Sequence, residues 1–208
     1  GELAVAQTVD FPPSQVYFHG NNKGRHELEA AVAWNIGRIV IDSFHEISLL
    51  EEVSSQAGKI QEVLIRVSPS VDPHTHAKTT TGILDSKFGF AIDTGAAHEA
   101  VRQVISSPHL DLKGLHFHLG SPIFDLEPYQ LGMEVVLSFA SSLREEGLNL
   151  QELSPGGGFA IAYTRDQIPP SSADYADTIV SSMTNCCQRL GIPLPNLLIE
   201  PGRAIIGP

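Results

Sequence analysis

The chain has 208 residues, of which 42% are hydrophobic and 18% charged, a composition that suits one domain with a packed core. Its formal net charge of -11 disfavours nucleic acids and anionic membranes as partners, because their own negative charge would repel it. No apolar run approaches the ~18 residues of a membrane-spanning helix. The two cysteines, Cys186 and Cys187, are adjacent and too few for a disulfide framework, so we expect packing residues in a cytoplasmic protein.

The two ends of the chain have no features of natural termini. The chain begins at Gly1 without a methionine or a signal-peptide pattern, and it stops at Pro208. We therefore expect residues 1–208 to form a single domain that is incomplete at both ends, within a longer protein.

Six apolar runs alternate along the chain with stretches of helical periodicity. The runs predict strands near residues 16–19, 38–42, 63–67, 114–119, 153–155 and 197–199. The periodic stretches predict helices near residues 25–37, 43–58, 94–107, 126–146 and 173–190. This alternation predicts an α/β fold with a buried parallel sheet and helices outside it. Six units are two fewer than a (β/α)8 barrel contains, so we expect a partial TIM-type barrel.

Local signals predict where two of these helices begin and end. Gly37 is placed to end the first helix and Gly58 the second, and Pro201 with Gly202 is placed to end the last strand. Ser43 and Glu46 have the spacing of a capping box, which would start the second helix.

Charged and special residues follow the predicted strands, where barrels hold their active sites. These residues are Lys23, Asp42, Arg66, His118, Gly156, Gly157, Gly158, Glu200 and Arg203. Asp42 could serve a site or bond local backbone, whereas Arg66 inside an apolar strand needs a partner. Glu200 and Arg203 could form a salt bridge with each other or complete a ligand site.

Taken together, these side chains match the parts of pyridoxal phosphate. The three glycines let backbone N–H groups approach a phosphate, and Arg203 could hold that phosphate or a carboxylate. His118 could stack on a flat ring or act as an acid or base. Glu200 beside a pyridine nitrogen would keep it protonated, and Arg66 could hold the phenolic oxygen of the ring. The combination predicts a pyridoxal phosphate site.

Several motifs occur in the order and spacing of a known family. They are His19-Gly20-Asn21-Asn22-Lys23, Lys87-Phe88-Gly89, Gly114-Leu115-His116-Phe117-His118-Leu119-Gly120-Ser121, Gly156-Gly157-Gly158 and Glu200-Pro201-Gly202-Arg203. Over essentially its whole length, the chain resembles the alanine-racemase-like, fold-type III pyridoxal phosphate decarboxylases. The segment Val71-Asp72-Pro73-His74-Thr75-His76, with Thr81-Gly82, resembles the diaminopimelate decarboxylase branch rather than the ornithine or arginine enzymes.

The resemblance implies a cofactor-binding barrel followed by a C-terminal β domain, in a homodimer with shared active sites. It also implies the decarboxylation of meso-2,6-diaminopimelate to L-lysine, the last step of lysine biosynthesis. His118 and Glu200 would be the catalytic residues, with His118 stacked on the ring and Glu200 on its nitrogen. Arg66 would lie near the ring oxygen, and Ser121 would lie near the phosphate. The phosphate ligands would be Gly156, Gly157, Gly158, Gly202 and Arg203, and Arg203 would also reach the substrate.

The chain departs from the family pattern in several places. The Schiff-base lysine of the family lies on an early strand and would precede Gly1; Lys23 is not that lysine, because it belongs to a different motif. The cysteine–glutamate motif and the tyrosine of the family's second domain are also missing from these 208 residues. Pro122 stands where glutamine is common, and Ser154-Pro155 replaces an aspartate–apolar pair. We therefore expect the 208 residues alone to be inactive and to bind the cofactor weakly, without a covalent bond.

Three alternatives remain open at this point. The protein could decarboxylate another amino acid, or it could be a relative that binds the cofactor without turnover. It could also be a metal-dependent barrel hydrolase, because His74 with His76, and His116 with His118 on one strand face, could each supply two ligands. No histidine follows His118, whereas such sites draw ligands from later strands, so we expect no catalytic metal.

Overall fold

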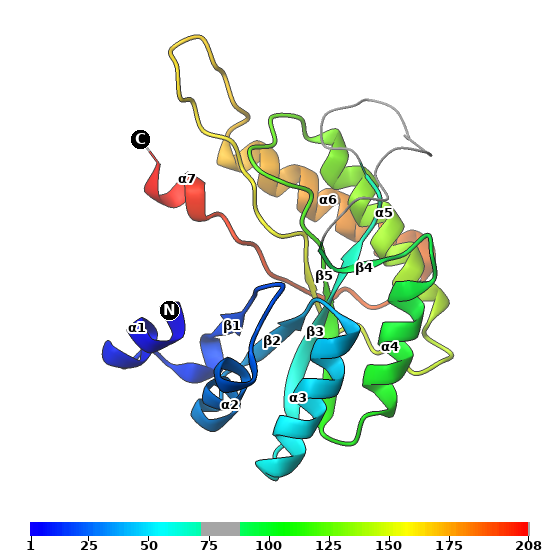
Figure 1. Cartoon of the computed structure of the whole chain (residues 1–208). Coiled ribbons are helices and arrows are strands. Elements are labelled where there is room, and N and C mark those ends of the chain that lie inside the picture. The colour runs from blue at the N-terminus through cyan, green and yellow to red at the C-terminus, as the bar shows by residue number, and fades with distance from the viewer. Residues whose placement is uncertain (72–87, 208) are drawn as a thin grey trace.

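The computed structural model describes residues 1–71 and 88–207 (Figure 1). The predicted residues His74, His76 and Lys87 lie outside this part of the chain. Its strands all pair in parallel, in the order β1-β2-β3-β5-β6-β7, with β4 beside β3. They are β1 (Tyr17–Phe18), β2 (Arg38–Ile41), β3 (Gln61–Ser68), β4 (Phe90–Ala91), β5 (Leu110–His116), β6 (Glu152–Ser154) and β7 (Asn196–Leu197).

The five predicted helices are present and connect the strands. They are α2 (Arg25–Trp34), α3 (Phe44–Gln56), α4 (Ala96–Ser106), α5 (Glu127–Ser142) and α6 (Ser172–Leu190). The sequence did not predict α1 (Glu2–Thr8), the 3-10 turn η1 (Pro13–Gln15), β4 or α7 (Gly202–Ile206), which are all short. None of the helices in the described ranges is both long and apolar enough to cross a bilayer.

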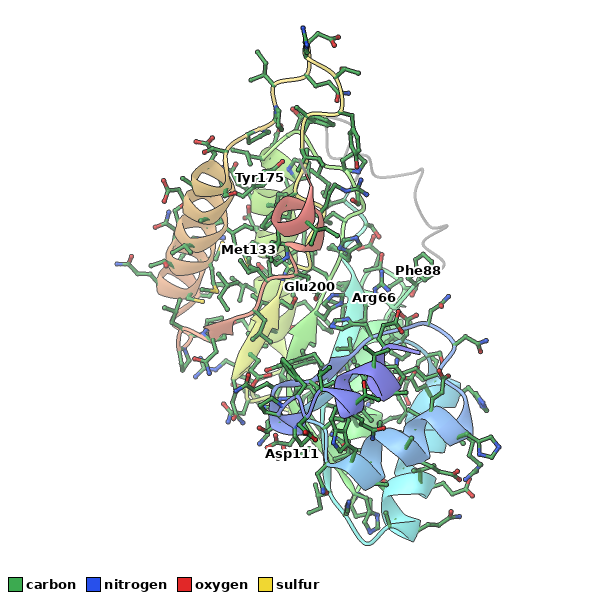
Figure 2. All side chains as sticks on the ribbon, turned by 90° about the vertical axis from the view of Figure 1, so that its left-hand side faces the viewer. Arg66, Phe88, Asp111, Met133, Tyr175 and Glu200 are labelled. Atoms are coloured by element: carbon green, nitrogen blue, oxygen red, sulfur yellow. The ribbon has the colours of Figure 1, made fainter. Side chains whose placement is uncertain are left out.

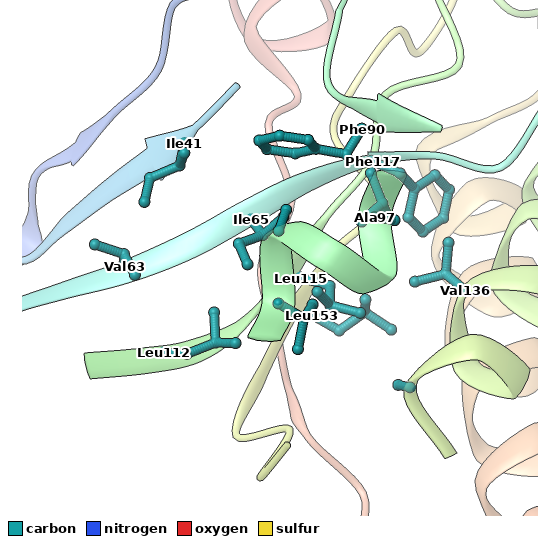
Figure 3. Packing of buried hydrophobic residues seen from close by; sticks show 14 of the residues in the cluster. Ile41, Val63, Ile65, Phe90, Ala97, Leu112, Leu115, Phe117, Val136 and Leu153 are labelled. Atoms are coloured by element: carbon teal, nitrogen blue, oxygen red, sulfur yellow. The ribbon is translucent and has the colours of Figure 1, made fainter. Parts of the chain in front are cut away.

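Strand alternation divides the side chains between two faces of the sheet. Odd-numbered β3 residues such as Val63 and Ile65 pack with Leu115 against α4 and α5, where Val136 is also buried (Figure 3). Even-numbered β3 residues, Glu62, Leu64 and Arg66, point to the other face. The helices therefore cover one face with apolar contacts, while the other face carries the polar groups.

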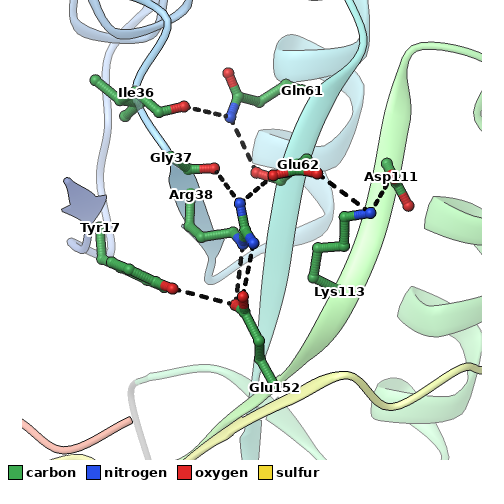
Figure 4. Close-up of polar contacts among 9 residues, drawn as sticks. All are labelled: Tyr17, Ile36, Gly37, Arg38, Gln61, Glu62, Asp111, Lys113 and Glu152. Carbon is green, nitrogen blue, oxygen red and sulfur yellow. Dashed lines mark hydrogen bonds and ion pairs between the residues drawn. The ribbon is translucent and has the colours of Figure 1, made fainter. Parts of the chain in front are cut away.

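Contacts between distant strands show that this second face is concave. Arg38 on β2 donates two hydrogen bonds, of 2.9 and 2.6 Å, to the carboxylate of Glu152 on β6, although β3 and β5 lie between these strands (Figure 4). Glu62 also contacts Arg38, and it forms an ion pair with Lys113 on β5 at 3.2 Å. A flat sheet would hold these groups too far apart, because neighbouring strands are ~4.8 Å apart. The sheet is therefore curved as in a barrel, with a layer of charges at its amino end.

Two strand predictions needed correction. The run Leu197–Ile199 was predicted to be a buried strand, but β7 covers only Asn196–Leu197 and Ile199 is 48% exposed. The cause is its position at the edge of the described sheet, with a neighbour on one side only. The strand predicted over 114–119 starts earlier and ends at His116, so His118 lies beyond it and the alternation argument for a shared face does not apply.

The helix-end predictions were partly right. The Ser43 hydroxyl accepts a hydrogen bond from the Glu46 N–H at 3.3 Å, which confirms the N-cap. The Glu46 carboxylate does not complete the box, because it pairs with buried Lys23 at 2.7 Å. Helix α2 ends in left-handed Asn35, so Gly37 is not its stop, whereas Gly58, at φ +63°, follows α3 as expected. Cys186 and Cys187 are buried free thiols, as predicted.

Candidate active site

The polar residues predicted at the strand ends lie together on the concave face. Figure 2 shows Glu200 and Arg66 at one end of the strands, far from Asp111 near the start of β5. Glu200 follows β7, and a single bridge pairs it with Gly157 after β6. The carboxyl ends of parallel strands meet at one edge, so residues far apart in sequence come together here.

Three side chains surround Oε1 of Glu200. The Ser154 hydroxyl donates to it at 3.0 Å, and His116 Nε2 and His19 Nε2 lie 3.1 and 3.6 Å away. Within the described residues, Oε2 accepts no hydrogen bond. The carboxylate is therefore fixed through one oxygen and keeps the other for a ligand.

Burial and neighbouring histidines act in opposite directions on the Glu200 carboxyl. Burial raises its pKa, but His116, His19 and the Ser154 hydroxyl more than offset this and lower the pKa to about 2. Burial also lowers the pKa of His19 to about 4, and it lowers the pKa of His118. At neutral pH the site thus presents an ionised carboxylate next to a neutral imidazole of His19.

The glycine turn after β6 is packed against the same residues. The Gly156 N–H donates to the Ser154 hydroxyl at 3.1 Å, and the buried Tyr129 hydroxyl donates to the Gly157 carbonyl at 2.7 Å. A Cβ on Gly157 would lie 1.9 Å from the Glu200 carbonyl oxygen, which leaves room only for glycine. Gly156 has φ +74°, which other residues rarely adopt. These glycines are therefore needed to bring Glu200 and the turn together.

His118 lies next to this turn. Its Nδ1 accepts a hydrogen bond from the Gly157 N–H at 3.3 Å, and the side chain is half-buried. That bond orients the imidazole ring and makes Nδ1 the acceptor, which leaves the proton of the neutral ring on Nε2. The predicted ring-stacking residue is thus held in one tautomer by the predicted phosphate loop.

Arg66 finds the partner that its position in β3 requires. Its guanidinium contacts Asp42 at 3.2 Å, and the other Asp42 oxygen accepts from the Gly89 N–H at 2.8 Å. The Arg66 guanidinium carbon also lies 4.9 Å from the centre of the Phe88 ring. Asp42 therefore positions Arg66 and also fixes the backbone at Gly89, the residue after Phe88.

The remaining predicted residues lie in two segments, one between β5 and α5 and the other after β7. Ser121 is exposed in the segment between β5 and α5. Gly202 begins α7 rather than ending a strand, and the Arg203 guanidinium carbon lies 5.5 Å from the centre of the Tyr163 ring. The salt-bridge alternative for Glu200 and Arg203 is wrong, because Glu200 contacts the serine and histidines instead.

Three contributors were missed or misread in the sequence. His19 was noted only within a motif, His116 only within a motif and as a possible metal ligand beside His118, and Ser154 only as a departure from an aspartate. Each stands at or directly after a strand end, a signal that could have found them. Lys23 was placed at the site but is buried at 6% exposure, where it donates to the Val40 carbonyl at 2.7 Å and pairs with Glu46.

Residues 1–207 match the model of the pyridoxal-dependent decarboxylases, pyridoxal binding domain. The chain belongs to this family. The family name implies pyridoxal phosphate as the cofactor, in agreement with the prediction from the strand-end residues.

Relatives similar to the chain over its whole length include diaminopimelate decarboxylases. The chain is 42% identical to a diaminopimelate decarboxylase of Corynebacterium efficiens and 40% identical to one of Bacillus subtilis, over all 208 residues in both cases. These alignments cover 45% and 47% of the relatives, so the chain spans about half the length of the curated relatives it matches.

Solved structures show the same relationship in three dimensions. A diaminopimelate decarboxylase of M. jannaschii matches 99% of this chain with a TM-score of 0.90 and 32% identity, and the match covers 47% of that protein. A Helicobacter pylori diaminopimelate decarboxylase complexed with L-lysine matches 99% of the chain with a TM-score of 0.83 and 29% identity, over 50% of that protein. The parallel sheet is therefore part of a barrel of this kind, which confirms the predicted partial barrel.

The donor set of the site fits pyridoxal phosphate. The free oxygen of Glu200 is a suitable acceptor for a protonated ring nitrogen, and the low pKa of this carboxyl keeps it charged. His118, Arg66 and the glycine turn stand at the same strand ends, where a flat, anionic molecule would meet an imidazole ring, a guanidinium group and backbone N–H groups. Nothing in this set conflicts with the cofactor that the family implies.

Proposed function

We propose that the protein decarboxylates meso-2,6-diaminopimelate to L-lysine and carbon dioxide with the help of pyridoxal phosphate. Two kinds of observation support this: the strand-end residues described above, and relatives named diaminopimelate decarboxylase at about 40% identity. The reaction would be the last step of lysine biosynthesis.

Within the chain, we assign the cofactor contacts as follows. His118 faces the ring, Arg66 lies toward its oxygen, and Glu200 accepts the N–H of the ring nitrogen. Backbone and side-chain groups of the loops hold the phosphate; they are Ser121, Gly156, Gly157, Gly158, Gly202 and Arg203. We further assign Arg203 to the substrate. When bound, the cofactor supplies a protonated ring that takes up the electrons released as the carbon–carboxylate bond breaks.

The position of Glu200 carries this proposal. Its Oε1 is held by Ser154 at 3.0 Å and stands beside His116, so that Oε2 remains available and ionised. A fixed carboxylate holds a proton on the ring nitrogen without having to reorganise as negative charge develops on the ring. His118 contributes a neutral ring held in place by Gly157.

Replacing Glu200 tests this role in the complete product of the gene. In Glu200→Gln the charge is lost while the size is kept, so turnover should fall by about a hundredfold or more. Cofactor occupancy, measured by absorbance after desalting, should fall much less. Glu145→Gln, an exposed acid on the same chain, is the control. An unchanged turnover number in Glu200→Gln would contradict the assignment.

A comparison of substrates distinguishes diaminopimelate decarboxylation from the decarboxylation of another amino acid and from cofactor binding without turnover. Carbon dioxide release is measured with meso-diaminopimelate, ornithine and arginine at equal concentrations. Release of carbon dioxide from diaminopimelate alone supports the proposal. Faster release from another amino acid would identify that amino acid as the substrate instead. Cofactor binding without release from any of them would identify a relative that does not turn over.

We also propose the setting in which this reaction takes place. Residues 1–208 would form one domain, supported by the single sheet and its shared apolar core. The complete gene product would act as a cytoplasmic homodimer with shared active sites, as the resemblance implies. Light scattering on the purified product measures its mass, and a monomer that keeps full activity would contradict the dimer.

A further inference from the structure

Three metal-ligand side chains converge at one point of the site. His19, His116 and Glu200 each offer a ligand atom, and these atoms all lie within 4.8 Å of one another. They come from the ends of β1, β5 and β7, so the folded sheet brings together residues that are distant in sequence. Two imidazoles and a carboxylate form a donor set that zinc sites use.

His116 supplies a second, independent observation. Its side chain is 2% exposed, and within the described residues neither ring nitrogen has a hydrogen-bond partner. Its Nε2 lies 3.1 Å from Glu200 Oε1 but lacks hydrogen-bond geometry toward it. A buried ring nitrogen that makes no hydrogen bond is costly, and an ion bound between Nε2 and the Glu200 oxygen would satisfy it.

The spacing of the ligand atoms suits a small cation. Tetrahedral zinc with bonds of about 2.0–2.1 Å separates its ligand atoms by about 3.3 Å. The Glu200 oxygen lies 3.1 Å from His116 Nε2 and 3.6 Å from His19 Nε2, on either side of that value. All three ligand atoms lie within 4.8 Å of one another, so the most distant pair would have to move closer before one ion could bind all three.

We propose that His19, His116 and Glu200 form a binding site for a divalent cation of the zinc type, with an open fourth position. Because Glu200 would then be engaged by the ion, the cation and the pyridine ring of the cofactor would exclude each other. The ion would thus occupy the cofactor-free protein and slow its loading. This exclusion, but not the metal site itself, rests on the proposed function.

The surroundings of His116 set the expected strength of binding. Ligating histidines normally donate their second N–H to an acceptor, and loss of such support weakens binding by about 10–100-fold. Within the described residues, Nδ1 of His116 has no such acceptor. We therefore expect a reversible site that a chelator empties readily, rather than a permanent structural zinc.

Zinc binding to the complete gene product, freed of cofactor, tests the site directly. Equilibrium dialysis against Zn²⁺ should give one ion per chain, and Co²⁺ should give visible absorption of a tetrahedral site. His19→Gln and Glu200→Gln should each weaken binding by more than about a hundredfold, since a ligand matters more than its outer support. Circular dichroism and thermal melting confirm that each variant is folded.

The controls separate this site from other histidines. His26 also stands beside a carboxylate, at 3.3 Å from Glu29, but its side chain is 97% exposed and no third ligand joins the pair among the described residues. His26→Gln and the double variant His74→Gln/His76→Gln should therefore bind zinc as the parent does. Absence of saturable zinc binding would overturn the site. So would binding that survives both His19→Gln and Glu200→Gln, or that is lost in a control variant.

A competition experiment tests the exclusion separately. Pyridoxal phosphate is titrated into the zinc-loaded protein while released zinc is measured with a coloured chelator. Release in proportion to cofactor binding supports mutual exclusion. If both bind together, the metal site stands and the contact between Glu200 and the ring is contradicted. If the cofactor binds but zinc never does, the proposed function stands and the metal site falls.

Discussion

Glu200 owes its properties to side chains that stand at the ends of other strands. Ser154 donates to it, His116 and His19 lie beside it, and Gly157 leaves room for its backbone. None of these residues lies near Glu200 in the sequence, so the low pKa of its carboxyl depends on the fold. Replacing any one of these neighbouring residues should therefore change the pKa of the Glu200 carboxyl.

Ser154→Ala should destabilise the chain through two lost contacts. The serine hydroxyl donates to Glu200 and accepts from the Gly156 N–H, and the residue is 2% exposed. Its loss leaves a buried N–H without an acceptor, which costs about 1–3 kcal/mol. Urea unfolding measures this cost. Ser106→Ala, whose exposed hydroxyl donates to a helix carbonyl at 2.9 Å, is the control and should change little.

His19 should make stability depend on pH. Burial lowers its pKa from 6.5 to about 4, so the folded chain binds this proton less tightly than the unfolded chain. The contribution of His19 to stability is therefore complete above pH 6.5 and is lost as the pH falls through about 4. Melting temperatures of the parent and His19→Gln, compared from pH 7 to pH 4, should show a smaller fall in the variant. Parallel curves would contradict the lowered pKa of this imidazole.

At the scale of elements, the sequence predicted every helix from α2 to α6 because periodicity and capping are local properties. It also predicted the strands that lie inside the sheet, since their apolar runs are continuous. It failed at β7, where an apolar run lies at an edge, and at α7, where Pro201-Gly202 starts a helix instead of ending a strand. The pairing of Arg66 with Asp42 could be anticipated only as a need for some partner.

The Lys23–Glu46 pair fixes the loop after β1 to helix α3. Both side chains are nearly buried, at 6% and 3% exposure, and their charged atoms lie 2.7 Å apart. Burial lowers the pKa of Lys23, and it raises the pKa of Glu46 to about 7, so each group depends on the other to remain charged. This is why Lys23, although it follows a strand, is a structural residue.

Lys23→Met should be strongly destabilising. It leaves the Glu46 carboxylate buried without its partner, which costs about 3–5 kcal/mol. Lys23→Met/Glu46→Gln should recover part of this loss, because no buried charge remains. Arg25→Met removes the exposed pair with Glu52, formed at 2.6 Å, and should cost less than about 1 kcal/mol. Urea unfolding measures the free energy of unfolding of each variant. Equal losses of this free energy in Lys23→Met and Arg25→Met would contradict a special cost of the buried charge.

At the scale of the whole molecule, curvature brings the site together. β1 and β7 are at opposite ends of the strand order, yet His19 after β1 lies 3.6 Å from Glu200 after β7. Composition and periodicity predicted a barrel, but not which side chains would meet across its concave face. That depends on register and curvature, which are set by the whole sheet. The same limit applies to the charged layer at the amino end, which the sequence did not reveal.

Arg38 joins three strands, β2, β3 and β6, in that charged layer, so its loss should weaken the curved sheet as a unit. It holds Glu152, which is 7% exposed and also accepts from the Tyr17 hydroxyl at 3.3 Å, and it contacts Glu62. Arg38→Met leaves the Glu152 carboxylate buried without its cation, and we expect a loss of about 3–5 kcal/mol.

Urea unfolding of three variants tests whether this cost comes from an unpaired buried charge. Arg38→Met/Glu152→Leu should be more stable than Arg38→Met, because a buried ion pair can be replaced by apolar groups at little cost. Arg189→Met is the matched control, since Arg189 pairs with Glu134 at 3.2 Å on the surface between α5 and α6 and should contribute less than about 1 kcal/mol. A midpoint shift in Arg38→Met no larger than in Arg189→Met, at an unchanged slope, would show that the layer does not stabilise the barrel.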